Sequence, residues 1–382
     1  MSGFRLSPEE RRHQQRMTAR LRTEMESAGG AIPFARFMEL ALYAPGLGYY
    51  VAGATKFGAG GDFVTAPEIS PLFGRTLATP CARILEEMGS GDLLEFGAGT
   101  GRLAAQLLGR LEELGRLPRR YFILEVSPDL QQRQRETLEK EAPHLLSWVE
   151  WLQRLPGRFQ GVMLANEVLD AMPVHLFRKG SDGLEEQWVA FSGPALEARW
   201  RPASPPLALA VERIEEAVGT LPPGYLSEVN LNLEPWLAAV GGSLDRGALL
   251  LIDYGHPRSV YYHPQRRMGT LRCHFRHRAH DDPLLLPGLQ DITAHVDFTA
   301  VAEGAEAAGL ERLAYATQAR FLLECGLDRL LARSDPENVA AHLALVQGAK
   351  QLLSPTGMGE SFKVMVLGRG VSGIGPLFGG SE

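Results

Sequence analysis

The sequence predicts an α/β protein whose central sheet is doubly wound, with parallel strands and with helices on both faces. From residue 92 onward, short apolar segments typical of buried strands alternate with amphipathic segments typical of helices. Such alternation builds βαβ units, whose strands are apolar on both faces because helices cover both sides. A glycine-rich turn joins the first of these strands to the next helix. The composition, 45% hydrophobic and 22% charged over 382 residues, excludes disordered and collagen-like chains.

The first part of the chain, residues 1–60, predicts a helical arm followed by a glycine-rich loop. Ser7 is suited to cap a helix over residues 7–29, with a proline next to it and a glycine pair at the end. Residues 33–43 have the apolar face of a second, short helix. The stretch from 44 to 74 is dense in glycine and carries aromatic side chains, so we expect a functional loop rather than disorder.

The core of the fold is expected at residues 61–256. Its strands are short and apolar, and the segments between them have the spacing of amphipathic helices. The predicted strands are 93–96, 121–126, 148–151, 162–166 and 248–253, and the predicted helices are 101–115 and 127–141.

An insertion at about 174–245 interrupts this pattern. Residues 174–201 alternate with period two around a Ser-Asp-Gly turn, which predicts a hairpin and a third strand. The remaining residues, 257–382, are expected to complete the sheet and a substrate crevice. Helices are predicted at 206–218, 232–240, 298–309 and 336–353, a strand at 362–368, and no element for the His- and Arg-rich segment 257–297.

Charge and cysteine content exclude several classes of protein. A net charge of -6 argues against nucleic acid as the main partner. The three cysteines form no CxxC pair, which excludes a zinc ribbon and fits a reducing compartment. No apolar run is long enough for membrane insertion, and the start lacks the pattern of a secretory signal. We expect a cytoplasmic protein; the excess of arginine over lysine favours a bacterial cytoplasm over a mitochondrial matrix.

The glycine-rich turn at residues 95–101 is the clearest local sign of a binding site. It lies between a strand and a helix, at the sheet edge where such folds bind nucleotides. Arg102 occupies the third glycine position of the dinucleotide pattern, which argues against a nicotinamide cofactor. An acid two residues before the first glycine suits S-adenosylmethionine, whose methionine end is cationic. The expected cofactor ligands in this turn are Glu95, Gly97, Ala98, Gly99, Thr100 and Gly101.

A second acid, Glu125, ends the next strand, where a carboxylate accepts hydrogen bonds from both ribose hydroxyls. The alternative is that neither feature binds a ligand: the glycines then serve only to form the turn, and Glu125 is a solvent-exposed residue at a strand end. Their joint placement on consecutive strands favours a site. Further residues expected to bind the cofactor are Val126, Trp151, Leu152, Asn166 and Thr65.

Glu167 and Asp170 follow another buried strand and are the candidate catalytic residues. If residues 167–172 are helical, the two carboxylates share one face, where they would clamp a guanidinium and accept its proton. The alternative is capping of a helix N-terminus by Asn166 and Glu167. Asp297 is likewise a helix cap or a catalytic group. Residues expected to bind substrate are Asp62, Phe63, Glu68 and Tyr254.

The histidines at 274, 277 and 280 lack the acid or thiol context of a known metal centre, so no metal is predicted.

Six blocks of the sequence together resemble the MidA-like methyltransferases, a family that includes a mitochondrial assembly factor of respiratory complex I and its bacterial relatives. The blocks occur in order between residues 61 and 298 and read GDFVTAPEIS, LLEFGAGTGRLA, ANEVLDAMPVHLF, LLIDYG, GTLRCHFRHRAH and DITAHVDF. The segment PFARFMELALYAPGLGYY resembles the start of the same family.

This resemblance implies a Rossmann-like class I methyltransferase that uses S-adenosylmethionine. It also implies a protein substrate, since the mitochondrial member dimethylates an arginine of a complex I subunit. Glu167 resembles the first acid of the carboxylate pair of arginine methyltransferases, and Asp170 is a looser candidate for the second. The alternatives are a non-catalytic S-adenosylmethionine-binding assembly factor, a small-molecule methyltransferase and a nicotinamide oxidoreductase. A homodimer is compatible with the sequence.

Overall fold

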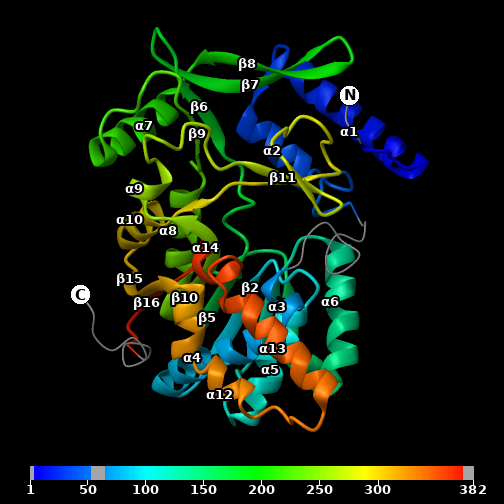
Figure 1. The fold of residues 1–382 in the computed structure, drawn as a ribbon, viewed down its shortest axis with the longest axis vertical. Coiled ribbons are helices and arrows are strands. Elements are labelled where there is room, and N and C mark those ends of the chain that lie inside the picture. Colours follow the sequence, from blue (N-terminus) through cyan, green and yellow to red (C-terminus); the bar gives the residue numbers. More distant parts are fainter. Residues whose placement is uncertain (1–3, 53–64, 373–382) are drawn as a thin grey trace.

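The computed structural model describes residues 4–52 and 65–372, which form a core built on a large sheet and a smaller lobe above it (Figure 1). The core sheet has the strand order β15-β16-β10-β5-β2-β3-β4. The strands from β10 to β4 run parallel, and β16 is antiparallel to both of its neighbours. The strand bounds are β2 Asp92–Phe96, β3 Tyr121–Leu124, β4 Val149–Leu152, β5 Phe159–Asn166, β10 Leu244–His256, β15 Glu311–Thr317 and β16 Phe362–Arg369.

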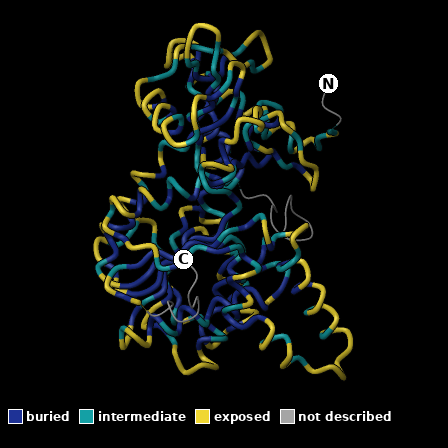
Figure 2. The backbone as a smooth tube through the Cα atoms, turned by 60° about the vertical axis from the view of Figure 1, so that its left-hand side comes forward, coloured by how far each residue is buried: buried dark blue, intermediate teal, exposed yellow. Residues whose placement is uncertain are grey.

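Both faces of this sheet are buried, as the apolar strands predicted. Leu250 packs into one hydrophobic cluster, and its neighbours Leu249 and Leu251 pack into the other. Figure 2 shows the sheet as a buried layer with exposed segments around it. Helices α4, α5, α12 and α13 contribute to the first cluster and α8 and α10 to the second. Their bounds are α4 Leu72–Met88, α5 Arg102–Glu113, α12 Leu327–Leu331, α13 Val339–Leu353, α8 Leu233–Ser243 and α10 Phe298–Ala307.

One expectation for the N-terminal region was wrong. The stretch 44–74 is not all loop, because its last part is helical: α3 spans Ala66–Ile69 and α4 begins at Leu72. Helix α4 was not predicted from the sequence, because it contains Pro80, a residue that disfavours helices; Pro80 lies buried inside the helix. Further elements that the sequence did not predict are α11 Gln318–Glu324, α14 Met358–Ser361 and strand β15.

The lobe combines the N-terminal arm with two later segments. Strand β7 pairs with β6 and β1 along one edge and with β8 along the other, and β9 pairs with β6. Helices α1 and α2 pack on this sheet together with a three-stranded sheet of order β12-β11-β13. The bounds are α1 Pro8–Ser27, α2 Phe34–Tyr43, β1 Ala31–Pro33, β6 His175–Lys179, β7 Leu184–Ser192, β8 Ala195–Pro202, β9 Leu226–Val229, β11 Arg272–Phe275, β12 Arg278–His280 and β13 Asp291–Thr293.

Local sequence explains where several of these helices begin. Ser7 caps α1 in a full capping box, in which its hydroxyl accepts from the Glu10 amide and the Glu10 carboxylate accepts from the Ser7 amide. Asp297 caps α10, since its carboxylate accepts from the amides of Thr299 and Ala300. The structure therefore favours the capping role of Asp297 over a catalytic one.

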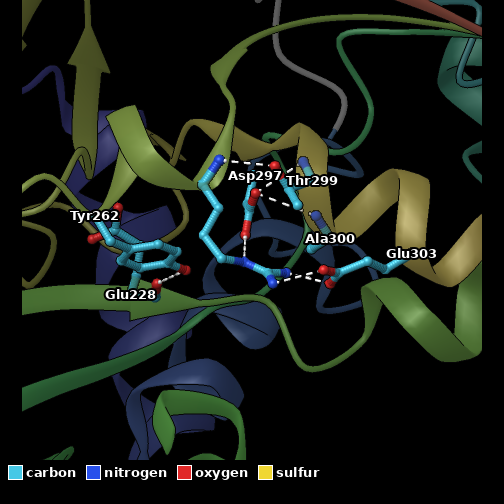
Figure 3. A network of polar contacts seen from close by, with 7 residues as sticks. Glu228, Tyr262, Asp297, Thr299, Ala300 and Glu303 are labelled. Atoms are coloured by element: carbon cyan, nitrogen blue, oxygen red, sulfur yellow. Dashed lines mark hydrogen bonds and ion pairs between the residues drawn. The ribbon is translucent and has the colours of Figure 1, made fainter. Parts of the chain in front are cut away.

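Helix α9, Arg258–Tyr261, connects the core to the lobe. The Arg258 guanidinium lies 3.0 Å from Asp297 and makes a bidentate pair with Glu303 at 2.8 and 2.5 Å. On the lobe side, the Tyr262 hydroxyl donates to the backbone carbonyl of Glu228 at 3.0 Å. Figure 3 shows Asp297 and Glu303 on one side of this junction and Tyr262 and Glu228 on the other. Polar contacts thus fix the lobe relative to the start of α10.

Candidate active site

A cavity of about 830 Å³ lies between the lobe and the carboxyl ends of the core strands. We call its core side the core wall and its lobe side the lobe wall. The core wall is formed by Glu95, Phe96, Gly97, Ala98, Gly99, Thr100, Glu125, Val126, Asn166, Glu167, Asp170 and Tyr254. The lobe wall is formed by Tyr43, Tyr50, Arg272, His274, Asp291, Thr293 and His295.

The glycine turn leaves space on its cavity side. Gly97 and Gly99 have φ angles of 58° and 52°, a left-handed conformation that glycine adopts without strain. A Cβ built on Gly99 would meet nothing within 4 Å, and one on Gly97 would meet only Val168, at 3.7 Å. Gly101, with φ 86°, serves packing instead, because a Cβ there would lie 2.9 Å from the Gln134 Cα. The turn therefore offers bare backbone to a ligand.

Glu95 presents a buried acid next to this turn. It is 3% exposed, and its carboxylate accepts a hydrogen bond of 2.6 Å from the Tyr121 hydroxyl. Burial raises the pKa of Glu95 to about 7, and the bond from Tyr121 opposes that rise. A cationic ligand group nearby would stabilise the ionised form.

Glu125 is held in place at the end of β3. Its carboxylate accepts from the Ser127 amide at 2.9 Å and from the Gln134 side chain at 3.2 Å. The Gln134 amide also donates to the Gly99 carbonyl, and its oxygen accepts from the Trp151 indole at 2.9 Å. Burial raises the pKa of Glu125. The network fixes a carboxylate beside the glycine turn, in position to accept two hydroxyl hydrogen bonds.

Glu167 has an unusual backbone conformation for a side chain of its size. Its φ of 54° is left-handed, which costs a residue other than glycine ~1–3 kcal/mol and is common at functional sites. The Asn166 amide donates to its carboxylate at 3.1 Å. Burial, and secondarily the neighbouring Asp170, raise the pKa of Glu167 to about 8. Residues 167–172 form turns, so the expectation of a helix there was wrong.

Asp170 lies in the same turn but has its own partner. The Tyr254 hydroxyl donates to its carboxylate, and burial raises the pKa of Asp170 to about 6. The turn is held by Asp253, whose carboxylate accepts from the amides of Leu169 and Asp170 at 3.0 and 3.2 Å. Glu167 and Asp170 therefore reach the cavity from a turn rather than from one helix face.

The lobe wall is closed by two stacked tyrosines. The rings of Tyr43 and Tyr50 lie 5.6 Å apart at an angle of 21°. The Tyr43 hydroxyl donates to the Ala171 carbonyl, and the Tyr50 hydroxyl donates to the Asp291 carboxylate, each at 2.9 Å. Sequence analysis did not single out Tyr43, Tyr50 or Asp291 as site residues. The only signal was the family-like blocks that contain them, because 241 positions separate Tyr50 from Asp291.

The predicted site residues are placed as follows. Glu68 lines the cavity from α3, where it accepts from the Thr100 hydroxyl at 2.5 Å and pairs with Arg102 at 3.2 Å. Gly101, Trp151 and Leu152 lie behind the core wall and do not line the cavity. Thr65 and the other predicted residues within the described ranges line it, and Asp62 and Phe63 lie outside those ranges.

The glycine turn, the two strand-end acids and the Glu167 turn all line or border one cavity. Residues 76–316 match a family of S-adenosyl-L-methionine-dependent methyltransferases. The chain belongs to this methyltransferase family. S-adenosylmethionine is its cofactor, and the open face of the glycine turn with Glu95 and Glu125 beside it fits that ligand: a carboxylate for its cationic end and another for its ribose.

Curated relatives extend over most of the chain. It is 31% identical to the rat mitochondrial protein arginine methyltransferase NDUFAF7, over 94% of this chain and 86% of that protein. It is 30% identical to the zebrafish protein of the same name, over 88% of this chain and 83% of the relative.

Two crystal structures from Burkholderia thailandensis match the whole fold. A COG1565 superfamily member solved with S-adenosyl-homocysteine is 46% identical, with a TM-score of 0.94, covering 99% of this chain and 98% of that one. A second structure, solved without a named ligand, is 45% identical with a TM-score of 0.89, covering 97% and 96%. The predicted class I methyltransferase fold is confirmed.

Two further properties of the described residues bear on function. Within residues 4–52 and 65–372, no helix combines the length and apolar character that crossing a membrane requires. In the same ranges, no group of three or more His, Cys, Asp or Glu side chains is arranged to hold a metal ion.

Proposed function

We propose that this methyltransferase modifies an arginine side chain of a protein. The observation that carries the proposal is the Glu167 carboxylate, which is half-buried on the cavity wall, stands in a left-handed turn and lies near the buried Asp170. Among the described residues, no lysine or arginine forms an ion pair with either acid. A buried carboxylate without a cation is costly, and a guanidinium entering the cavity would remove that cost.

The residues of the core wall have distinct tasks in such a reaction. S-adenosylmethionine supplies an electrophilic methyl group. Glu167 would accept N–H bonds from the guanidinium and hold the attacking nitrogen in line, and the incoming cation would return the raised pKa of Glu167 toward its usual range. The methylated nitrogen then loses its proton to Glu167 or water. Positioning and electrostatics carry most of the effect.

Asp170 and the lobe wall would hold the rest of the acceptor. Asp170 is oriented by the Tyr254 hydroxyl, and Asp291 by Tyr50, so both carboxylates face the cavity in fixed positions. The stacked rings of Tyr43 and Tyr50 offer aromatic surface, which favours flat cations such as guanidinium. The printed names of the curated relatives, protein arginine methyltransferases, support the same acceptor class. A complex I subunit is the first candidate protein to test.

The test is to identify the acceptor directly. A lysate of the source cells is incubated with methyl-labelled S-adenosylmethionine and the purified protein, and labelled products are located by mass spectrometry. Glu167→Gln serves as the control enzyme. We expect label on an arginine of a protein with the wild type and none with the variant. Label found only in small molecules would replace the proposal with a small-molecule methyltransferase, and no label at all would favour a non-catalytic assembly factor.

A further inference from the structure

A second cavity, of about 370 Å³, lies in the core away from the active site. It is formed where α4 and α5 end and α12 begins. Both longer helices start near the active site, α5 directly after the glycine turn and α4 directly after α3, which carries Glu68. In Figure 1, α4, α5 and α12 lie at the lower end of the core, opposite the lobe. This cavity is therefore separate from the methyl-transfer site.

Arginine side chains dominate the lining of this cavity. Five of them contribute, and Glu86 is the one acid in the described lining; the arginines are Arg83, Arg110, Arg116, Arg329 and Arg333. The whole chain carries a net charge of -6. A concentration of positive charge in one hollow thus runs against the overall charge balance, and such a hollow attracts anions.

Three of these arginines have no acidic partner. Arg116 pairs with Glu86 at 2.5 Å, and Arg110 pairs with Glu113 at 2.7 Å. Within the described ranges, no hydrogen bond or ion pair involves the guanidinium groups of Arg83, Arg329 and Arg333. Arg83 is half-buried and Arg329 and Arg333 are exposed, so their charges are open to an anion that enters the cavity.

Arg110 adds a buried donor to the same hollow. Its side chain is 13% exposed, and its Nε is buried without a hydrogen-bond partner. An unsatisfied buried donor destabilises the protein, and more so when the group is charged. Arg110 lies in the last turn of α5, where a cation also complements the helix dipole. That effect accounts for its charge but not for the unpaired Nε.

We propose that this arginine cavity binds a phosphate-bearing anion. Guanidinium groups present forked donors that match phosphate oxygens in pairs, and several of them around one hollow favour a group with more than one negative charge. The lining also includes the apolar residues Ala82, Leu114 and Leu330, which would accept a non-polar part of the ligand. The phosphate could belong to a free small molecule or to the headgroup of an anionic lipid.

Calorimetry with inorganic pyrophosphate tests the proposal on the full-length protein. The test variant is Arg83→Gln combined with Arg329→Gln, and the matched control is Arg312→Gln, an exposed arginine of β15 that lines neither the active-site cavity nor the arginine cavity. We expect saturable one-site binding to the wild type, at least ~10-fold weaker binding to the double variant, and no change in the control. Unchanged affinity for S-adenosylmethionine in all three proteins would show that the fold is intact.

Vesicle sedimentation distinguishes the two sources of phosphate. The wild type and the double variant are each sedimented with two kinds of vesicle. One kind contains phosphatidylcholine alone, and the other contains phosphatidylcholine mixed with the anionic lipid phosphatidylglycerol. Binding to the anionic vesicles that depends on Arg83 and Arg329 assigns the site to a lipid headgroup. Pyrophosphate binding without vesicle binding assigns it to a free molecule. If the wild type binds neither probe, or if Arg312→Gln weakens binding as much as the double variant does, the proposal is wrong.

Discussion

The core wall and the lobe wall of the active-site cavity differ in how far apart in sequence their residues lie. Glu95, the glycine turn and Glu125 come from two consecutive strands and the turns that follow them. The lobe wall joins Tyr50 to Asp291 across 241 positions. The cofactor side is thus built from local strand–turn–helix units, and the acceptor side depends on tertiary contacts. Four substitutions test whether the core wall mainly serves the cofactor and the lobe wall mainly serves the acceptor.

The largest effect is expected for Glu167→Gln, at the boundary of the two walls. The amide keeps the size of the side chain but loses the negative charge that orients and deprotonates the acceptor, so turnover should fall by roughly 10³-fold. Affinity for S-adenosylmethionine, measured by calorimetry, should stay within about twofold. Glu150→Gln, an exposed change on β4, is the matched control. Turnover near the wild-type rate would remove Glu167 from the chemistry.

Gly97→Val should mainly affect the core wall. A branched side chain at a φ of 58° is strained, and its methyl groups would enter the space that the cofactor occupies. We expect S-adenosylmethionine affinity to fall by about 100-fold, with the circular dichroism spectrum unchanged. Gly109→Val is the control, since a Cβ there meets nothing within 4 Å and the site is remote from the cavity. Near-normal affinity of the Gly97 variant would contradict the placement of the cofactor on this turn.

Asp291→Asn should mainly affect the lobe wall. The amide oxygen can still accept the hydrogen bond from Tyr50, but the negative charge that Asp291 presents on the cavity wall is lost. The KM for the protein acceptor should rise by about 10-fold, while cofactor affinity stays constant. Asp245→Asn, at the start of β10, removes the same charge elsewhere. If cofactor affinity changes as much as the KM for the acceptor does, the two walls do not act separately.

The smallest effect is expected for Tyr121→Phe, and it is measured as a change in how S-adenosylmethionine affinity depends on pH. The cationic cofactor binds best when Glu95 is ionised, so its affinity should fall as pH drops through about 7, the pKa of that acid. Tyr121→Phe removes the hydrogen bond that lowers this pKa, which moves the transition to higher pH and weakens binding a few-fold near neutrality. Calorimetry at pH values on both sides of neutrality gives both curves. A pH-independent affinity would exclude Glu95 from cofactor binding.

The sequence was sufficient for the core wall because its signals are local. The apolar strand before Glu95, the glycines after it and the acid that ends the next strand are all visible in short windows. The helix that would place Glu167 and Asp170 on one face does not form, and Asp253, which is distant in sequence, accepts from the amides of Leu169 and Asp170 in a turn. Trp151 ends a predicted strand and was expected to bind the cofactor, yet its indole bonds to Gln134 behind the wall.

The lobe wall could not be derived in this way. Neither Tyr43 nor Asp291 stands next to a feature that marks a site, and the pairing of Tyr50 with Asp291 exists only once β13 has packed against the N-terminal arm. The segment 257–297 showed no periodicity, because its strands have only two to four residues. Its Thr270 hydroxyl donates to Glu228 of β9 and accepts from the His295 backbone amide, contacts that short sequence windows do not show.

The pairing of β1 with β7 has a consequence for how the protein is made. Strand β1 of the N-terminal arm is synthesised before its partner β7, because Val189, which lies opposite Ile32, follows more than a hundred residues later. Its remaining apolar partners, Cys273 and Ile292, come later still. During translation the apolar side chains of the arm stay exposed until their partners are synthesised. Exposed apolar side chains promote aggregation and are binding sites for chaperones. Asp291 is synthesised 241 positions after Tyr50, so the wall that the two residues form together is completed late in translation.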